Sequence, residues 1–269
     1  MTDDLAHLAT EATDPRFAQI DRMTVADLAA AMNDADTSVP DAVRAALPQV
    51  TAAITGVSQR MARGGRLIYV GAGTAGRLGV LDASECVPTF STPPGLVTAI
   101  IAGGPSAIVT PVEGAEDDPD AGVCAIDSAG VGPLDSVVGI TSSGRTPYVV
   151  AAVTRARERG AYSVGLTSNV GSDLAAAAEQ PIEVVVGPEV ISGSTRLKAG
   201  TAQKLVLNMI STITMVQLGK TYGNLMVDVR PTNHKLRERA VRIVQQLTGV
   251  GESAARAALV EAGWDVKVA

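Results

Sequence analysis

The sequence predicts an α/β protein built on a five-stranded parallel sheet sandwiched by helices, a Rossmann-like arrangement, with helical extensions at both ends of the chain. Five short apolar runs alternate with helical segments, and continuous apolar runs are typical of strands buried on both faces of a parallel sheet. A glycine-rich stretch at residues 71–77 directly follows the first run, as in nucleotide- and phosphate-binding α/β proteins. The chain has 269 residues, 46% of them hydrophobic, which is enough for a sizeable core.

The first 60 residues are expected to be helical, because apolar residues recur at helical spacing over residues 24–36 and 41–65. Thr24 and Asp41 are the expected N-caps of these two helices. The five strands are expected at the apolar runs over residues 66–70, 96–102, 135–141, 162–168 and 182–187.

Helices are expected between and after these strands, over residues 77–86, 147–160 and 201–219 and again in the tail. The sequence therefore suggests three regions. These are a helical segment over 1–60, a sheet domain over 61–220 and a second helical segment over 221–269.

Composition excludes several classes of function. The net charge of −6 and the pI of about 5.0 argue against nucleic acid or an anionic membrane as the main partner. Cys86 and Cys124 form no disulfide framework, and His7 and His234 are too few for a histidine-based zinc site or a Ser-His-Asp triad. The N-terminus has no apolar signal core, and no run approaches the roughly 18 residues that span a bilayer. We expect a cytoplasmic protein without a membrane anchor.

Gly71, Gly73 and Gly76 form a GxGxxG pattern, which suggests NAD as one ligand. That interpretation also requires an acidic residue at the end of the second strand to hold the ribose hydroxyls. Residues 100–104 contain no Asp or Glu, so the dinucleotide hypothesis is disfavoured.

A second loop indicates another ligand. Residues 141–146, TSSGRT, follow the third strand and place Ser142, Ser143 and Thr146 at the start of a helix. Hydroxyls and helix N-terminal N–H groups together suit one phosphomonoester. The alternative is that these side chains only cap the following helix, for which one hydroxyl would suffice.

This order of strand, glycine loop and hydroxyl-rich loop resembles the sugar isomerase (SIS) domain, which binds phosphosugars. Longer blocks resemble the N-acetylmuramic acid 6-phosphate etherase family over nearly the whole chain. These blocks are residues 10–24, 71–90, 113–118, 191–212 and 223–240.

The resemblance implies cleavage of the D-lactyl ether of N-acetylmuramic acid 6-phosphate without a cofactor, by elimination and then addition of water. It implies two catalytic carboxylates, Glu85 as the acid at the C3 oxygen and Glu116 as the base at C2. Glu85 follows the glycine loop on the same predicted helix, so we expect it to face the same crevice. Without the resemblance, Glu85 would be taken for an exposed helix residue and Glu116 for part of a solvated acidic run.

Substrate contacts are expected from the two loops and from the stretch 192–201, whose cations suit a carboxylate or phosphate but equally suit surface ion pairs. The candidates are Gly73, Thr74, Ser142, Ser143, Arg145, Thr146, Ser194 and Lys198. The resemblance further implies a homodimer with shared active sites. A non-catalytic phosphosugar sensor similar to glucokinase regulatory protein and an aldose–ketose isomerase stay open as alternatives. A SIS-type transcription factor is disfavoured because the first 60 residues are too acidic for a DNA-binding motif.

Overall fold

A parallel sheet forms the centre of the molecule. The computed structural model describes residues 7–229, 231 and 233–269, and within them five strands pair in the order β2-β1-β3-β4-β5, every neighbouring pair parallel. The strands are β1 Leu67–Gly71, β2 Val97–Ile101, β3 Ser136–Ile140, β4 Tyr162–Thr167 and β5 Gln180–Glu183. Every residue of β1, β3 and β4 is buried, as continuous apolar runs require. The predicted fold class is confirmed.

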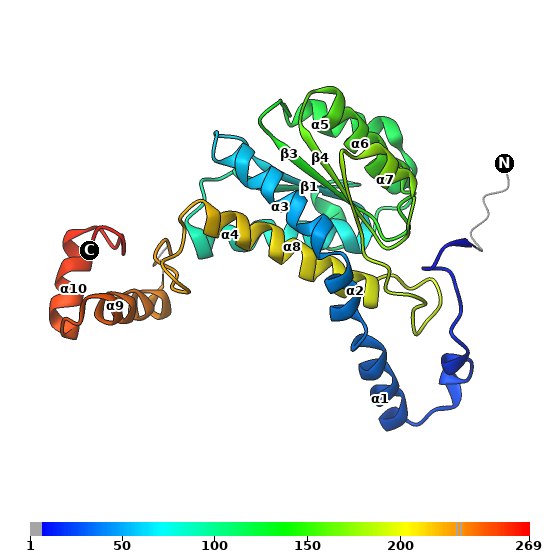
Figure 1. Cartoon of the computed structure of the whole chain (residues 1–269), viewed down its shortest axis with the longest axis horizontal. Helices are drawn as coiled ribbons and strands as arrows, with labels where there is room; N and C mark the ends of the chain where they lie inside the picture. Colours follow the sequence, from blue (N-terminus) through cyan, green and yellow to red (C-terminus); the bar gives the residue numbers. More distant parts are fainter. Residues whose placement is uncertain (1–6, 230, 232) are drawn as a thin grey trace.

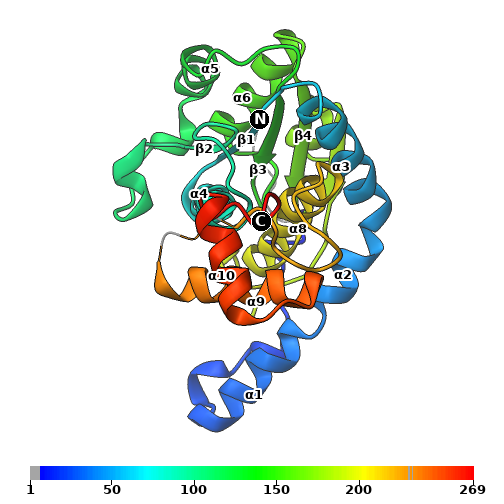
Figure 2. The ribbon, with the colours of Figure 1, turned by 90° about the vertical axis from the view of Figure 1, so that its left-hand side faces the viewer.

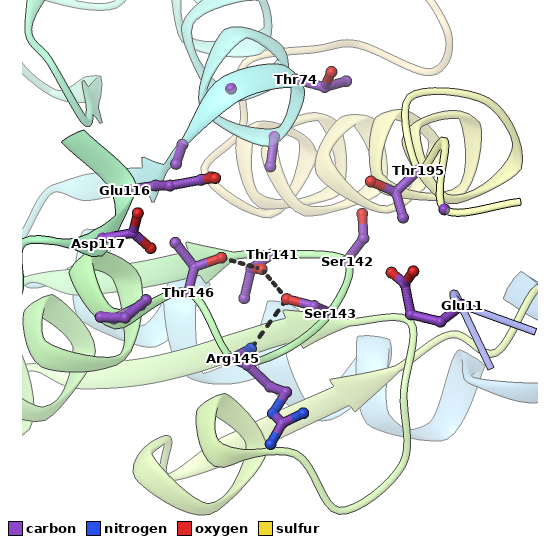
Figure 3. Close-up of a pocket in the computed structure, with 15 residues that line it drawn as sticks. Glu11, Thr74, Glu116, Asp117, Thr141, Ser142, Ser143, Arg145, Thr146 and Thr195 are labelled. Atoms are coloured by element: carbon purple, nitrogen blue, oxygen red, sulfur yellow. Dashed lines mark hydrogen bonds between the residues drawn. The ribbon is translucent and has the colours of Figure 1, made fainter. Parts of the chain in front are cut away.

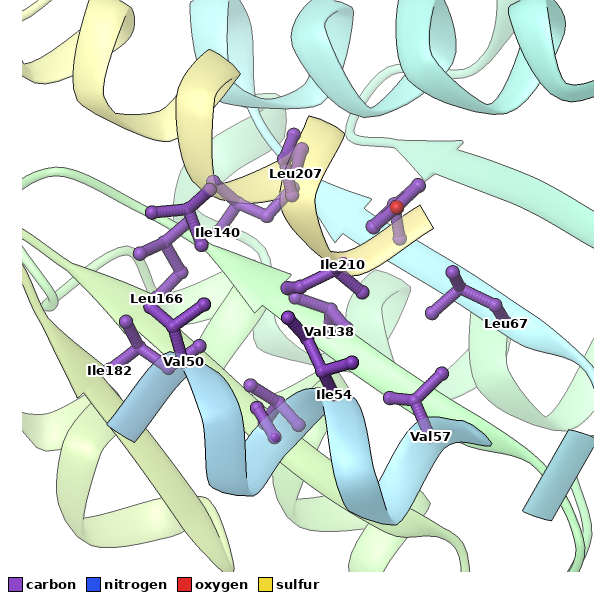
Figure 4. Close-up of a cluster of buried hydrophobic side chains, with 14 of the residues drawn as sticks. Val50, Ile54, Val57, Leu67, Val138, Ile140, Leu166, Ile182, Leu207 and Ile210 are labelled. Carbon is purple, nitrogen blue, oxygen red and sulfur yellow. The ribbon is translucent and has the colours of Figure 1, made fainter. Parts of the chain in front are cut away.

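Helices cover both faces of this sheet (Figure 1). One face carries α2 Val39–Ala45, α3 Leu47–Met61, α4 Gly73–Phe90 and α8 Lys198–Gln217. The other face carries α5 Pro119–Ser128, α6 Pro147–Glu158 and α7 Asp173–Ala177. Because successive strand residues point to opposite faces, Leu67 and Tyr69 join the first core while Ile68 and Val70 join the second. Figure 4 shows the first core, where side chains of α3 and α8 meet those of the strands.

The N-terminal region differs from the prediction in more than one place, since residues 7–23 form turns and short 3₁₀ helices in place of an α-helix. The segment expected as one helix over 41–65 is two helices, because Pro48 at the second position of α3 has no N–H to donate back into α2. The expected cap at Thr24 is confirmed, since its hydroxyl accepts from the Asp27 N–H at 3.2 Å. The expected cap at Asp41 is wrong, because that residue lies inside α2.

Several element boundaries and two short helices also differ. Helix α4 begins at Gly73 and not at residue 77, so the glycine-rich stretch is mostly its first turn. Strand β5 ends at Glu183 because its partner β4 ends at Thr167, where the two residues pair. Helices α5 and α7 were not anticipated. Both are short, which leaves little apolar periodicity to detect.

The two ends of the chain extend away from the sheet layers (Figures 1 and 2). The short turns η2 Pro15–Phe17 and η3 Ile20–Arg22 precede α1 Val25–Asp36, which buries only Ala35. Helices α9 His234–Thr248 and α10 Glu252–Glu261 pack on each other around a separate apolar cluster. In the part of the chain that the structure describes, no helix is both long enough and apolar enough to cross a bilayer.

Candidate active site

A cavity of about 430 Å³ opens at the carboxyl ends of β1 and β3. These strands are neighbours although β2 separates them in the chain, so the cavity lies where the strand order reverses, the place where open α/β sheets bind ligands. Most of its lining is polar and comes from several distant segments. The lining residues are Glu11, Ala72, Gly73, Thr74, Ala75, Glu116, Asp117, Thr141, Ser142, Ser143, Arg145, Thr146, Pro147, Gly193 and Thr195.

The glycine-rich stretch forms the turn from β1 into α4 at one wall of this cavity. A Cβ on Gly71 would meet the Gly76 nitrogen at 2.6 Å, and a Cβ on Gly76 would meet the Gly71 oxygen at 2.8 Å. The two glycines therefore allow strand and helix to touch, which leaves Ala72 alone between the two elements. The N-terminus of α4 faces the cavity and favours an anion there.

The hydroxyl-rich loop after β3 forms the floor (Figure 3). The Thr141 and Thr146 hydroxyls lie 2.7 Å apart, the Thr141 and Ser143 hydroxyls 3.3 Å, and the Arg145 N–H donates to the Ser143 hydroxyl at 3.2 Å. Thr146 is the N-cap residue of α6, yet its side chain makes no capping bond. The helix-capping interpretation of these hydroxyls is therefore not supported, and they remain directed at one another and at the cavity.

Two buried amides hold this loop from behind. The Gln203 side chain donates to the Ser142 hydroxyl oxygen at 2.9 Å, which directs the hydroxyl hydrogen of Ser142 elsewhere. The Asn169 side chain donates to the carbonyls of Ser142 at 3.0 Å and Ser143 at 3.3 Å, and also to the Thr10 hydroxyl at 3.1 Å. The loop is therefore fixed before any ligand arrives.

Carboxylates flank the hydroxyls. Glu116 and Asp117 belong to the turn η5 Ala115–Asp117, and Glu11 reaches the same cavity from the N-terminal segment. Figure 3 shows Glu11 and Glu116 on opposite sides of the loop hydroxyls. The cavity thus combines anion-binding groups with negatively charged hydrogen-bond acceptors.

Glu85 lies elsewhere in the same chain. It is an exposed side chain on a separate cleft of about 620 Å³ that includes Asp82, Asn208 and Ser211. It follows Gly73 by twelve residues, and a helical rise of 1.5 Å per residue puts it about 18 Å further along α4. The single chain therefore does not bring Glu85 to the cavity that Glu116 lines, contrary to the expectation of one shared crevice.

Asp82 is the buried carboxylate of this second cleft. It accepts hydrogen bonds from the Tyr69 hydroxyl at 2.8 Å, the Asn208 amide at 2.6 Å and the Ser211 hydroxyl at 3.1 Å. Burial raises the pKa of Asp82, although these three donors oppose the shift. The network ties α4 to β1 and α8 directly behind Glu85.

Of the remaining predicted contacts, Gly73, Thr74, Ser142, Ser143, Arg145 and Thr146 line the cavity, whereas Ser194 and Lys198 do not. The guanidinium of Arg145 points away from the hydroxyls in Figure 3. Lys198 is buried, its ammonium donates to the Val186 carbonyl at 2.7 Å, and burial lowers its pKa. The buried Glu189 carboxylate accepts from the backbone N–H of Lys198 at 2.9 Å, so this segment anchors the start of α8.

Sequence reasoning missed Glu11, Thr195, Gln203 and Asn169. Thr195 lies within the stretch 192–201 that the sequence singled out, and Glu11 within the N-terminal block that carried the family resemblance. Gln203 and Asn169 gave no signal, because neither a polar residue within a helix nor an asparagine in the loop after a strand is recognisable as the anchor of another loop before the fold is known. In the described part of the chain, no three His, Cys, Asp or Glu side chains gather as a metal site.

The strand order, the glycine turn and the hydroxyl-rich loop define a phosphosugar-binding protein of the SIS class. Residues 127–213 match the SIS domain, residues 49–157 the N-terminal SIS domain of glucokinase regulatory protein, and residues 223–269 the C-terminal lid domain of that protein. A relative named N-acetylmuramic acid 6-phosphate etherase from Streptomyces avermitilis is 59% identical over 266 residues, which cover 98% of this chain and 85% of the relative. A relative of the same name from Rubrobacter xylanophilus is 58% identical over 269 residues, which cover 100% of this chain and 89% of that one. The chain belongs to the N-acetylmuramic acid 6-phosphate etherase family.

A solved structure of a phosphoheptose isomerase from Francisella tularensis shares the fold. Its TM-score is 0.57 at 19% identity, with 72% of this chain and 100% of that chain covered. The predicted family and fold are both confirmed by these comparisons.

Proposed function

We propose that this protein cleaves the D-lactyl ether of N-acetylmuramic acid 6-phosphate and releases N-acetylglucosamine 6-phosphate and D-lactate. The observation that carries this proposal is the identity of 59% to an etherase across 98% of the chain. The cavity supports it, because hydroxyls and two helix N-termini suit the phosphate while Glu116 lies beside the place where the sugar would extend.

The elimination needs two proton transfers, the addition of water needs two more, and no step is a redox step. Opening of the sugar ring exposes an aldehyde at C1, which acidifies the C2 hydrogen. A base takes that proton, an acid protonates the C3 ether oxygen, and the C3–O bond breaks with release of lactate. Water then adds across the C2–C3 double bond, its hydroxyl to C3 and a proton to C2. Positioned acid–base groups contribute about 10²–10⁴-fold each to such steps.

Glu116 is our candidate for the base at C2. It lies at the rim of the cavity, on a turn that starts at Gly114 with a φ of +71°, and near the N-terminus of α4. Replacement by glutamine keeps the shape and removes the proton acceptor. We expect Glu116→Gln to lower kcat by about 10²–10⁴-fold with substrate binding retained.

Glu85 is our candidate for the acid at the C3 oxygen, contributed by a second copy of the chain. Its cleft lies about 18 Å along α4 from the cavity of the same chain, so it cannot act there. Helices α1, α9 and α10 project from the body and offer surfaces through which two copies can associate (Figure 1). A homodimer with shared sites accounts both for the distance of Glu85 from the cavity of its own chain and for the projecting helices.

Complementation tests this sharing. Glu85→Gln and Glu116→Gln chains are each expected to be inactive when expressed alone. If sites are shared, a mixed dimer holds one site with both glutamates intact, so random co-assembly restores about one quarter of the wild-type activity. If both glutamates act within one chain, the mixture contains no intact site. A mixture that stays inactive although mixed dimers form would contradict the shared site.

The activity itself is tested by D-lactate release from N-acetylmuramic acid 6-phosphate with no added metal or nucleotide. Folded protein that releases no lactate would refute the etherase proposal. The second candidate is a non-catalytic phosphosugar regulator, which the matches of residues 49–157 and 223–269 to glucokinase regulatory protein favour. A regulator would bind the phosphosugar without turnover.

We place this activity in the cytoplasm, on amino sugars recovered from peptidoglycan. Cys86 and Cys124 are both free thiols, as is usual in a reducing compartment. The relatives that carry the etherase name are bacterial.

A further inference from the structure

The side of the cavity opposite Glu116 is formed by a segment that the reaction above does not use. Residues 8–12 cross the end of the hydroxyl-rich loop, and Glu11 lines the cavity from this segment. Thr10, the residue before Glu11, is only 1% exposed, so this segment is packed into the folded structure.

Four hydrogen bonds hold this segment, and none of them uses the Glu11 carboxylate. The Ala9 N–H donates to the Asn169 amide oxygen at 2.8 Å, and the Asn169 amide donates to the Thr10 hydroxyl at 3.1 Å. The Ser192 hydroxyl donates to the backbone carbonyls of Glu11 at 3.1 Å and Ala12 at 3.4 Å. The segment is therefore fixed by its backbone and by Thr10, which leaves the Glu11 side chain available to a ligand.

The same Asn169 amide also donates to the loop carbonyls of Ser142 and Ser143. One buried side chain thus sets the position of Glu11 relative to the phosphate-binding hydroxyls. The Glu11 Oε2 atom lies over Gly193, where an added Cβ would be 3.2 Å away. Within residues 7–229, 231 and 233–269, the structure records no hydrogen-bond donor to this carboxylate, although it is a strong acceptor.

We infer that the Glu11 carboxylate binds the sugar part of the ligand by accepting a hydrogen bond from a ring hydroxyl or from the acetamido N–H. This inference rests on the proposed function, because it takes the ligand to be an amino-sugar phosphate. A carboxylate repels the phosphate and the lactyl carboxylate, so both must lie away from Glu11. Glu11 thereby orients the sugar, with its donor groups toward the N-terminal segment and its phosphate toward the hydroxyls and N–H groups of the loop.

The test compares two ligands on three forms of the protein. Binding of N-acetylglucosamine 6-phosphate and of inorganic phosphate is measured by calorimetry for wild type, Glu11→Gln and Asp21→Asn. Asp21 is an exposed acid in η3 outside the cavity, so its variant controls for the loss of one negative charge near the N-terminus. Thermal melting of each variant controls for folding.

Glu11→Gln is expected to bind N-acetylglucosamine 6-phosphate about tenfold more weakly, because a hydrogen bond to a charged acceptor is replaced by one to a neutral amide. Its affinity for inorganic phosphate should stay within about twofold of wild type, since phosphate occupies only the loop, and Asp21→Asn should match wild type for both ligands. The inference is overturned if the sugar phosphate loses less than about twofold, or if both ligands weaken in parallel. Wild-type protein that binds phosphate but not the amino-sugar phosphate would also overturn it. Failure of the proposed etherase activity would give a different result, in which the protein binds the sugar phosphate but releases no D-lactate from N-acetylmuramic acid 6-phosphate.

Discussion

Gly144 is the residue on which the shape of the hydroxyl-rich loop depends. Its φ is +75°, in the left-handed region, and a Cβ there would collide with the Ser172 side chain and lie 2.7 Å from the Thr167 hydroxyl oxygen. Its carbonyl accepts from the Leu174 N–H at 2.9 Å, which ties the loop to the start of α7. Gly144→Ala therefore imposes both backbone strain and a steric clash.

The magnitude follows from these two contributions. The left-handed conformation costs a non-glycine residue about 1–2 kcal/mol. Forcing an extra methyl group into a packed site costs about 1–3 kcal/mol more. We expect Gly144→Ala to lower the free energy of unfolding by about 2–5 kcal/mol.

Gly95→Ala is the matched control. Gly95 has a φ of +85°, but an added Cβ would meet nothing within 4 Å, so this variant carries the strain without the clash. Urea unfolding of both variants isolates the clash, and calorimetry with inorganic phosphate reports on the loop. Equal unfolding free energies, within about 0.5 kcal/mol, together with unchanged phosphate affinity would refute this account of the loop.

Three further predictions concern other parts of the molecule. Burial opposes ionisation of Asp135, but hydrogen bonds from Arg66 and from backbone N–H groups outweigh it and lower its pKa. The carboxylate therefore stabilises the fold at pH values above its unfolded pKa of about 3.9, and this stabilisation is lost as the pH falls through the lower folded pKa. Asp135→Asn should destabilise the protein by about 1–3 kcal/mol at pH 7, and thermal melts should show this difference shrinking toward pH 3. Burial raises the pKa of the Cys86 thiol to about 12, whereas Cys124 is exposed. A thiol reagent at pH 8 should therefore modify only Cys124 in the native protein and both cysteines in urea. Gln203→Glu turns a donor to the loop serine into an anionic acceptor and should weaken inorganic phosphate binding by at least about tenfold; unchanged affinity would contradict the role given to that amide.

The strands and the hydroxyl-rich loop were predictable because local sequence encodes them. An apolar run such as residues 135–141 is buried on both faces wherever it sits in a parallel sheet, and the carboxyl ends of neighbouring parallel strands meet at one edge. The hydroxyls of Ser142, Ser143 and Thr146 therefore had to face the crevice. The boundaries of α4 and β5 were less predictable, since a glycine turn and the length of a partner strand decided them.

The roles of single polar residues were not encoded locally. Lys198 begins α8 beside several hydroxyls, as an anion-binding cation would, yet its ammonium turns inward to a backbone carbonyl. Glu85 shares a helix with the glycine turn, yet the rise of that helix carries it to another cleft.

By itself, the sequence determined the parallel α/β sheet, the hydroxyl-rich loop and the family, because each depends on contiguous residues in a recognisable order. Only the tertiary structure decided that Glu11, Asn169 and Gln203 meet at that loop. Asn169 lies 159 positions from Thr10 and still donates a hydrogen bond to it. Such contacts follow from the packing of the N-terminal segment and α8 against the sheet, and no local pattern of residues specifies them.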